Sequence, residues 1–154
     1  MRKNMSEQKD GKYEYPSGDI HWYKNGELHR DDGPATEYTS GSKEWFFNGE
    51  RHRLDGPAVE YFDGTKEWWL NGQLHRIDGP AIESSSGSKM WYVNGELHRE
   101  NGPAIIKASG TKSWWLNGIQ YTEEEVNTYL EKKKLKKVLQ QNLDEKINQQ
   151  KSKI

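Results

Sequence analysis

The chain has 154 residues, 31% of them apolar and 31% charged, with a formal net charge of -1 at pH 7. This length fits one domain, and the absence of cysteine excludes disulfide scaffolds, thiolate metal sites and cysteine nucleophiles. The near-neutral charge argues against polyanion binding by charge alone, the mean hydropathy of -1.19 excludes a membrane span, and seven tryptophans argue against disorder.

The first segment, residues 1–16, is a polar and charged lead-in. It lacks the apolar stretch of a secretory signal. We therefore expect a cytoplasmic protein whose repeated part begins near residue 17.

Residues 17–121 repeat with a period of 23, without insertion or deletion, as four full copies and a partial fifth. Asn-Gly begins at residues 25, 48, 71, 94 and 117, and Gly-Pro-Ala begins at residues 33, 56, 79 and 102. The same step places one tryptophan in each copy, at Trp22, Trp45, Trp68, Trp91 and Trp114. It also places a His-Arg pair in each full copy, with the arginines Arg30, Arg53, Arg76 and Arg99.

One copy shows what each unit folds into. Residues 58–61 and 66–70 are β-prone runs separated by an Asp-Gly-Thr turn, and Asn71-Gly72 is a strong signal for a type I′ hairpin turn. Pro80 then ends the unit, because proline cannot donate a ladder hydrogen bond. A single hairpin is marginal in water, but stacked copies bury aromatic rings against one another. The sequence predicts a mainly β fold, an elongated antiparallel sheet of stacked hairpins with a C-terminal helix.

A 23-residue unit with aromatic residues, Asn-Gly, His three residues after that Gly, and then Asp-Gly resembles the MORN repeat. The His-Arg-x-Asp-Gly-Pro-Ala variant is also similar to repeat proteins of phages, large viruses and some bacteria. MORN units usually carry Gly after the His, where this chain has Arg. The resemblance implies an elongated hairpin array with a role in protein contacts or oligomerisation.

The aromatic pairs and the arginines form the candidate binding surface. Trp68 and Trp69 are adjacent in a predicted strand, so they point to opposite faces and each face carries an aromatic row. One interpretation is that both rows are structural. The other is a stacking surface made by the five tryptophans together with the four arginines, since Trp and Arg are typical of interface hot spots and also stack on bases.

The repeated histidines do not predict a metal site. Equivalent positions in stacked hairpins lie about 9–10 Å apart, whereas zinc ligands lie about 2 Å from the ion. We expect a ladder in which each histidine bonds the neighbouring turn. The aspartates after His-Arg, with Asn101 in the last copy, are expected to cap turns. No nucleophile or base stands out, so we expect no enzyme and no cofactor.

Residues 122–154 form the third segment, a basic helical tail. Thr122 and Glu125 make a capping box that predicts a helix start. The first apolar stripe is expected to cover the last hairpin, and the later one to face solvent or to serve as a partner or oligomerisation helix; the candidates are Val126, Tyr129, Leu130, Leu135 and Leu139. Residues 131–154 carry a net charge of +5 and the other 130 residues carry -6. Lysines alone are a weak nucleic-acid signal, so we do not expect such binding.

Two functions fit these patterns. The first is a non-enzymatic protein-interaction module, an inhibitor or adaptor of phage or bacterial type that binds a partner protein or a further copy of itself. The second is a protein that binds or sequesters a small ligand such as a nucleotide on the Trp and Arg surface. A ligand site should use residues that break the repeat, among them Lys24, Met90, Asn101, Ile106, Gln120 and Tyr121.

Overall fold

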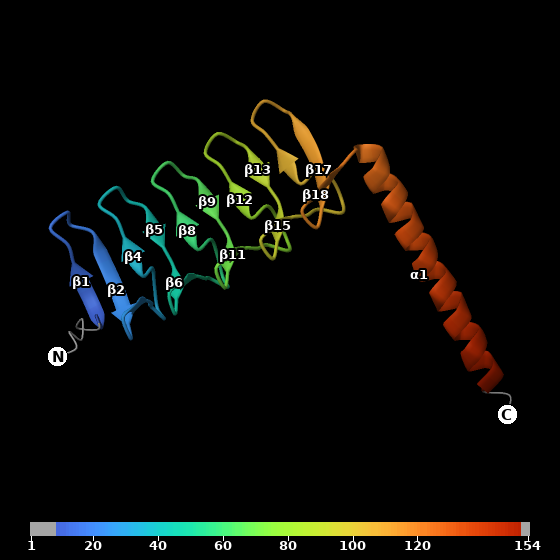
Figure 1. Ribbon diagram of the computed structural model, residues 1–154, viewed down its shortest axis with the longest axis horizontal. Coiled ribbons are helices and arrows are strands. Elements are labelled where there is room, and N and C mark those ends of the chain that lie inside the picture. Colours follow the sequence, from blue (N-terminus) through green and yellow to red (C-terminus); the bar gives the residue numbers. More distant parts are fainter. Residues whose placement is uncertain (1–8, 152–154) are drawn as a thin grey trace, which may run out of the picture.

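The computed structural model describes residues 9–151, which form an elongated array of β-hairpins followed by a single long helix (Figure 1). Successive copies of the repeat lie side by side along the array, and helix α1 (Glu123–Lys151) leaves from the last copy. The predicted mainly β fold with a C-terminal helix is confirmed. Residues 1–8 of the lead-in and 152–154 of the tail lie outside the described residues.

The strands are short, and most of them belong to one antiparallel sheet of twelve strands. Its members are β1 (Gly11–Glu14), β2 (Ile20–Lys24), β3 (Glu27–Leu28), β4 (Thr36–Glu37), β5 (Lys43–Glu44), β8 (Val59–Glu60), β9 (Lys66–Glu67), β12 (Ile82–Glu83), β13 (Lys89–Met90), β16 (Ile105–Ile106), β17 (Lys112–Leu116) and β18 (Ile119–Tyr121). Three separate hairpins pair β6 (Phe46–Phe47) with β7 (Glu50–Arg51), β10 (Trp69–Leu70) with β11 (Gln73–Leu74), and β14 (Tyr92–Val93) with β15 (Glu96–Leu97). The lead-in contributes β1, so the paired sheet begins before residue 17.

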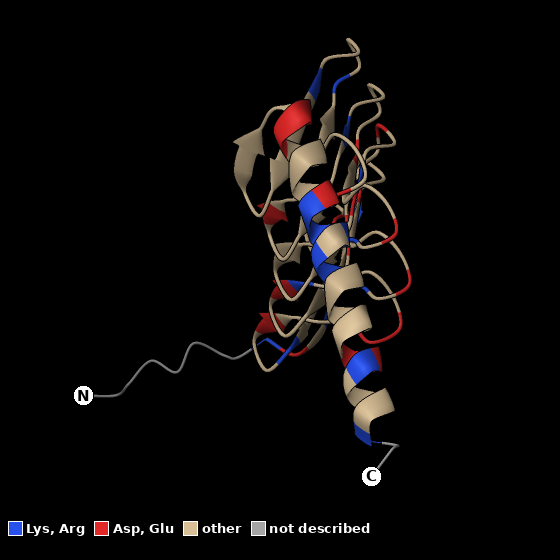
Figure 2. Cartoon of the chain, turned by 90° about the vertical axis from the view of Figure 1, so that its right-hand side faces the viewer, with Lys and Arg blue, Asp and Glu red and all other residues tan. Residues whose placement is uncertain are grey.

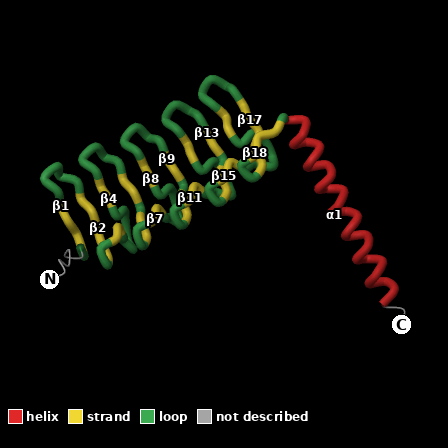
Figure 3. The backbone as a smooth tube through the Cα atoms, viewed as in Figure 1, coloured by secondary structure: helices red, strands yellow, loops and turns green. Residues whose placement is uncertain are grey.

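Each copy alternates between a long hairpin in the main sheet and a short hairpin closed by Asn-Gly (Figure 3). The tryptophan stands between the two and divides the predicted run 66–70 into β9 and β10. The Trp68 N–H donates to the Ala81 carbonyl at 2.8 Å, and the Trp68 carbonyl accepts from the His75 N–H at 3.0 Å. Trp68 therefore joins the following strand of the main sheet to its own short hairpin.

The array is thin and has a small apolar core. Among the described residues, the alanine of each Gly-Pro-Ala is fully buried, and the other buried apolar side chains are few. The fully buried alanines are Ala35, Ala58, Ala81 and Ala104; Val59, Leu116 and Val126 complete the set. The carbonyl of each of these alanines also accepts the backbone N–H of a tryptophan, as in the bond from the Trp45 N–H to the Ala58 carbonyl at 2.8 Å. Alanine recurs at this position because its side chain is fully enclosed.

The Asn-Gly turns have the backbone that the sequence predicted. In all five, Asn and Gly both have positive φ, as in Asn71 at 49° and Gly72 at 71°. A type I′ turn requires positive φ at both central residues, so the predicted turn type is confirmed. Each turn also contacts the preceding copy, since the Gly72 N–H donates to the Arg51 carbonyl at 3.0 Å.

The lead-in closes the N-terminal end of the array by supplying the contacts that a preceding copy would make. The Lys9 carbonyl accepts the Gly26 N–H at 2.9 Å, as the Leu28 carbonyl does for the Gly49 N–H in the next copy. The Asp10 carboxylate accepts the Asn25 N–H at this first turn. Residues 9 and 10 thus occupy the place of the missing copy.

Helix α1 closes the C-terminal end with its first turns only. The Thr122 N–H donates to the Glu125 carboxylate at 2.8 Å, and the Glu125 N–H donates to the Thr122 hydroxyl at 3.2 Å. This reciprocal pair confirms the predicted capping box, and the Thr122 N–H lowers the pKa of the Glu125 carboxyl below its ordinary value. Val126 is only 2% exposed. Beyond it the helix diverges from the array (Figure 1) and extends past its edge (Figure 2).

Within residues 9–151, no helix is both long enough and apolar enough to cross a membrane.

The turn geometry predicts the effect of Gly72→Val. A β-branched residue strains at positive φ, at a cost of about 1–3 kcal/mol. We expect the melting temperature to fall by about 2–4 °C for each kcal/mol lost. Gln73→Val, on the exposed strand position next to the turn, is the matched control and should leave the melting temperature nearly unchanged. Equal melting temperatures for Gly72→Val and the native chain would contradict the turn assignment.

Candidate functional site

The repeated tryptophans and arginines pack against each other in every full copy, and we call these pairs the Trp–Arg ladder. The guanidinium carbon of each arginine lies over the tryptophan ring eight residues earlier in the chain. The distances to the ring centroid are 3.9 Å for Arg30 over Trp22, 4.1 Å for Arg53 over Trp45, 4.0 Å for Arg76 over Trp68 and 3.8 Å for Arg99 over Trp91. Such stacking contributes about 0.5–2 kcal/mol per pair. Trp114 has no arginine partner at this spacing and pairs with Tyr121 across β17 and β18.

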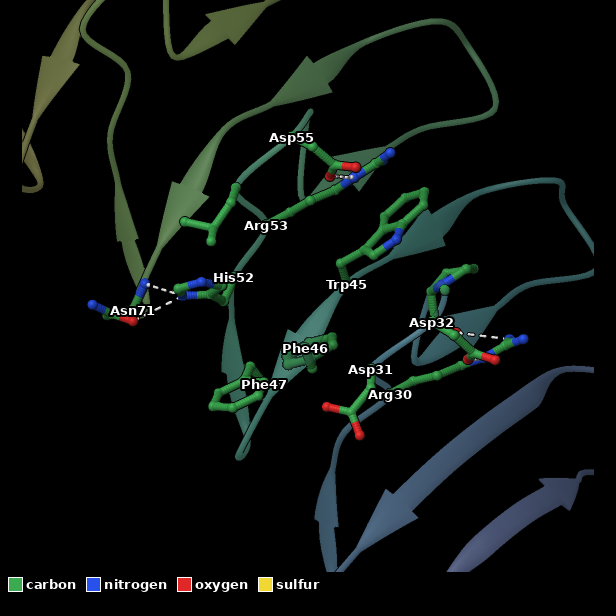
Figure 4. A pocket seen from close by; sticks show the side chains of 13 residues that line it. Arg30, Asp31, Asp32, Trp45, Phe46, Phe47, His52, Arg53, Asp55 and Asn71 are labelled. Atoms are coloured by element: carbon green, nitrogen blue, oxygen red, sulfur yellow. Dashed lines mark hydrogen bonds and ion pairs between the residues drawn. The ribbon is translucent and has the colours of Figure 1, made fainter.

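Each ladder arginine is also bound along its polar edge, as Figure 4 shows for Arg53 and Asp55. The Arg53 Nε–H donates to Asp55 at 2.9 Å, and Nη1–H donates to the Pro57 carbonyl at 3.1 Å and to Glu60 at 3.3 Å. Arg30 and Arg76 repeat this pattern. One arginine therefore holds its tryptophan, the following loop and the next strand together.

These contacts change how the candidate binding surface can act. The ring face that a base would stack on is covered by the copy's own guanidinium, and three of the four guanidinium groups are paired with two carboxylates each. The loop aspartates act as arginine partners. The Arg53 guanidinium lowers the pKa of the Asp55 carboxyl below its ordinary value, and Arg76 does the same for Asp78.

Open notches lie between successive loops on this face. We call the loops, residues 31–32, 54–55, 77–78 and 100–101, the loop row. The three notches have volumes of about 770, 520 and 550 Å³, and their walls include Trp45, Trp68 and Trp91 respectively (the first is drawn in Figure 4). Leu54 is 85% exposed and Ile77 is 77% exposed on the loop row. The notches thus present apolar side chains beside carboxylates.

The last full copy departs from the pattern at its arginine. Arg99 donates to the amide oxygen of Asn101 at 3.2 Å and to the Pro103 carbonyl at 3.1 Å. Asn101 replaces the loop aspartate, and Ile106 replaces the glutamate that pairs with the arginine in the earlier copies. Sequence comparison of the copies identifies both departures, but only the structure shows that they meet at one guanidinium.

The second aromatic row lies on the opposite face, as predicted. Trp69 donates its Nε1–H to Glu67 at 2.8 Å, and Glu67 lies opposite Ile82 in the sheet register, whereas the partner of Arg76 is the adjacent Glu83. Since Ile82 and Glu83 are neighbours in one strand, they point to opposite faces.

A half-buried ion pair on this second face was not predicted from the sequence. Arg51 donates to Glu44 at 2.9 Å, and the Tyr38 hydroxyl donates to the same carboxylate at 3.3 Å. Burial raises the pKa of the Tyr38 hydroxyl above its ordinary value, and the nearby Glu44 charge adds to this rise. The signal was present in the sequence, because Arg51 stands where the other full copies have leucine.

The repeated histidines contact the turn of the next copy, which confirms the predicted ladder. His52 Nδ1 lies 2.8 Å from the Asn71 side-chain oxygen and accepts the Asn71 N–H at 3.2 Å (Figure 4). His21 belongs to a different cluster, where its Nδ1 lies 3.3 Å from the Tyr23 hydroxyl. Burial raises the pKa of Tyr23 to about 12. Within residues 9–151, no three histidine or carboxylate side chains are grouped to hold a metal ion.

The helix residues divide into two sets. Val126 is buried and Leu130 half-buried against the array end, while Tyr129 is 44% exposed. The apolar residues further along form the α1 stripe, which is 39–60% exposed: Leu135, Val138, Leu139, Leu143 and Ile147. Lys133 lies between these two sets in the sequence, and its ion pair with Glu100 links the helix to the loop row.

No protein-family model matches the chain, and no curated protein matches it either. The resemblance to MORN repeats therefore stays a prediction from the residues.

Because each ladder arginine stacks on a tryptophan and donates several hydrogen bonds, we predict that Arg76→Lys destabilises the array although the charge is kept. Lysine has no planar group to stack on Trp68 and cannot donate in a fork to Asp78 and Glu83. We expect a loss of about 1–3 kcal/mol in the free energy of unfolding by denaturant titration. Lys107→Arg, an exposed change in the turn between β16 and β17, serves as the control. A stability equal to that of the native chain would show that the ladder is not a stabilising contact.

The lowered pKa values of Asp55 and Asp78 predict a pH dependence. A carboxyl with a lowered pKa in the folded state stabilises the fold above its unfolded pKa of about 3.9, and this contribution is lost as the pH falls through the folded value. The melting temperature of the native chain should therefore fall in acid more than that of Asp55→Asn/Asp78→Asn. Both aspartates are strongly exposed, so the difference should be small and should shrink with added salt. Parallel pH profiles would contradict it.

Proposed function

We propose that this chain is a non-enzymatic protein-interaction scaffold whose C-terminal helix docks a partner protein. The α1 stripe carries this proposal. Five large apolar side chains along one helix remain 39–60% exposed. A single exposed apolar residue is ordinary on a protein surface, but a contiguous set of them marks an interaction surface. An amphipathic helix that lies in an apolar groove is a common mode of protein recognition.

The way α1 is attached supports this role. Only Thr122 lies between β18 and α1, and its capping box with Glu125 fixes the direction of the first turn. Val126 anchors that turn, and the Lys133–Glu100 pair adds a contact two turns later. The α1 stripe begins beyond these contacts, so the array does not cover it and its side chains stay exposed to solvent.

The charges near the stripe define the partner's chemistry. Lys132, Lys134, Lys136 and Lys137 are exposed around its first half, and residues 131–154 carry a net charge of +5. Figure 2 shows these basic residues along the upper half of the helix. A complementary partner has an apolar groove with an acidic rim, because complementary charges speed association and exclude wrong partners.

The array supports the proposal as an extended platform. Its Trp–Arg ladder is satisfied internally, which fits a structural role for that row, while Leu54 and Ile77 offer further apolar contacts on the loop row. The molecule thus carries exposed apolar side chains both on α1 and on the loop row.

Removal of the stripe tests this function. We expect Leu139→Ser/Leu143→Ser to weaken capture of the partner protein by at least about tenfold, because two central apolar contacts are lost. The measurement is affinity capture with the full chain, followed by titration of the recovered protein against both purified variants.

The matched control is Gln141→Ser/Asn148→Ser, which changes two polar residues on the other side of the same helix. Only a protein that binds the native chain and the control, loses binding to the stripe variant and binds more weakly at high salt would support the proposal. If no captured protein distinguishes the two variants, the helix is not the docking element. Circular dichroism checks that α1 remains helical in both.

A further inference from the structure

The face of the sheet that carries the Trp–Arg ladder also carries a row of alternating glutamates and lysines. In the register of the sheet, Glu60 lies opposite Lys43 on one side and Lys66 on the other. Directly opposed residues have Cβ atoms about 4.5–5.5 Å apart and share a face. The ladder arginine adds a third cation, since Arg53 lies 3.3 Å from the Glu60 carboxylate. Each such glutamate therefore sits among positive groups.

The same arrangement recurs one copy later. Glu83 lies opposite Lys66 and Lys89, and Arg76 approaches its carboxylate to 3.0 Å. In the last full copy the cations remain but the carboxylate does not. Ile106 occupies the glutamate position, with Lys89 and Lys112 opposite it and Arg99 as the ladder arginine. We call Arg99, Lys89, Lys112 and Ile106 the cation cradle.

The second departure removes charge from the same place. Asn101 replaces the loop aspartate and gives Arg99 a neutral oxygen at 3.2 Å. Glu100, the nearest acid in the chain, pairs with Lys133 instead. Among the described residues no carboxylate lies within ion-pair distance of Arg99, in contrast to Arg30, Arg53 and Arg76, which have two each. Burial without a compensating carboxylate lowers the pKa of Arg99.

We propose that the cation cradle binds an oxyanion, a carboxylate or a phosphate group, in the place that glutamate carboxylates fill in the preceding copies. Isoleucine carries no carboxylate, so Arg99 and the two lysines opposite Ile106 lack, at this position, the internal partner that Glu83 supplies one copy earlier. The guanidinium is held flat on Trp91 at 3.8 Å and keeps a planar edge for a bidentate partner. Arg99 also lines the third notch, of about 550 Å³, whose lining includes Asp78 and Glu100, while Lys89, Ile106 and Lys112 lie outside it.

This site is independent of the α1 stripe. It lies on β13, β16, β17 and the loop before β16, and none of its members belongs to the helix. The binding of an oxyanion and the docking of a partner on α1 can therefore each fail without the other.

The experiment is a titration of the full chain followed by nuclear magnetic resonance, with inorganic phosphate and acetate as separate probes. Chloride keeps the ionic strength constant, because exposed charges are screened by salt. We expect saturable shifts of the Arg99 side-chain N–H and of the backbone amides around Ile106, Lys89 and Lys112. Saturation by phosphate alone or acetate alone identifies the oxyanion source, and saturation by both shows a general oxyanion site.

Two variants provide matched controls. Ile106→Glu restores the internal carboxylate and should weaken anion binding by at least about tenfold, while its melting temperature verifies that it is folded. Glu83→Ile should create a second cradle and add saturable shifts at the Arg76 side chain. Shifts spread evenly over the exposed lysines and unchanged in Ile106→Glu, or no saturable shift with either probe, would overturn the proposal.

Discussion

The arginine that follows each histidine is the contact on which the array depends. In one side chain it stacks on a tryptophan, pairs with the loop that follows and reaches the carboxylate of the next strand, as Arg53 does with Trp45, Asp55 and Glu60. Among the described residues, the buried apolar side chains are four alanines, two valines and one leucine. A structure with so small a core needs specific contacts between neighbouring segments, and repetition supplies the same set in every copy.

Regular repetition also makes departures informative. Where every copy has the same residue, the simplest explanation is a shared structural role, and the Trp–Arg ladder and the His–Asn contacts show such roles directly. Where one copy differs, the neighbours that served the missing group are left in place. Arg99 keeps its position and its tryptophan but loses both carboxylates, which is the physical basis for the proposed oxyanion site. The two ends of the array differ for another reason, because Asp10 accepts the turn N–H that a histidine accepts in later copies, and Val126 is buried at the other end.

The features that were predictable from the sequence are those governed by local geometry. Asn71-Gly72 requires positive φ whatever surrounds it, and the Thr122–Glu125 capping box involves residues only three apart. The histidine ladder was predictable because a fixed period and a fixed strand spacing together determine which turn each ring can reach. The division of the run 66–70 at Trp68 was not predictable in this way. It depends on Ala81 and His75, which bond Trp68 from two directions.

The sequence by itself determined the hairpin unit, its period, the stacking of the copies into an elongated sheet and the start of the helix. Each of these follows from backbone preferences and from regular spacing. Tertiary structure alone decided which side chains remain available. The arginines that the sequence suggested as binding residues are paired with carboxylates of the array itself, except Arg99, which donates to a neutral amide oxygen. The apolar residues of α1 beyond Leu130 remain exposed because the helix follows its capped first turn past the end of the array. Whether a side chain is free to bind a partner depends on contacts between copies and on the path of an entire helix. A local sequence pattern does not determine either.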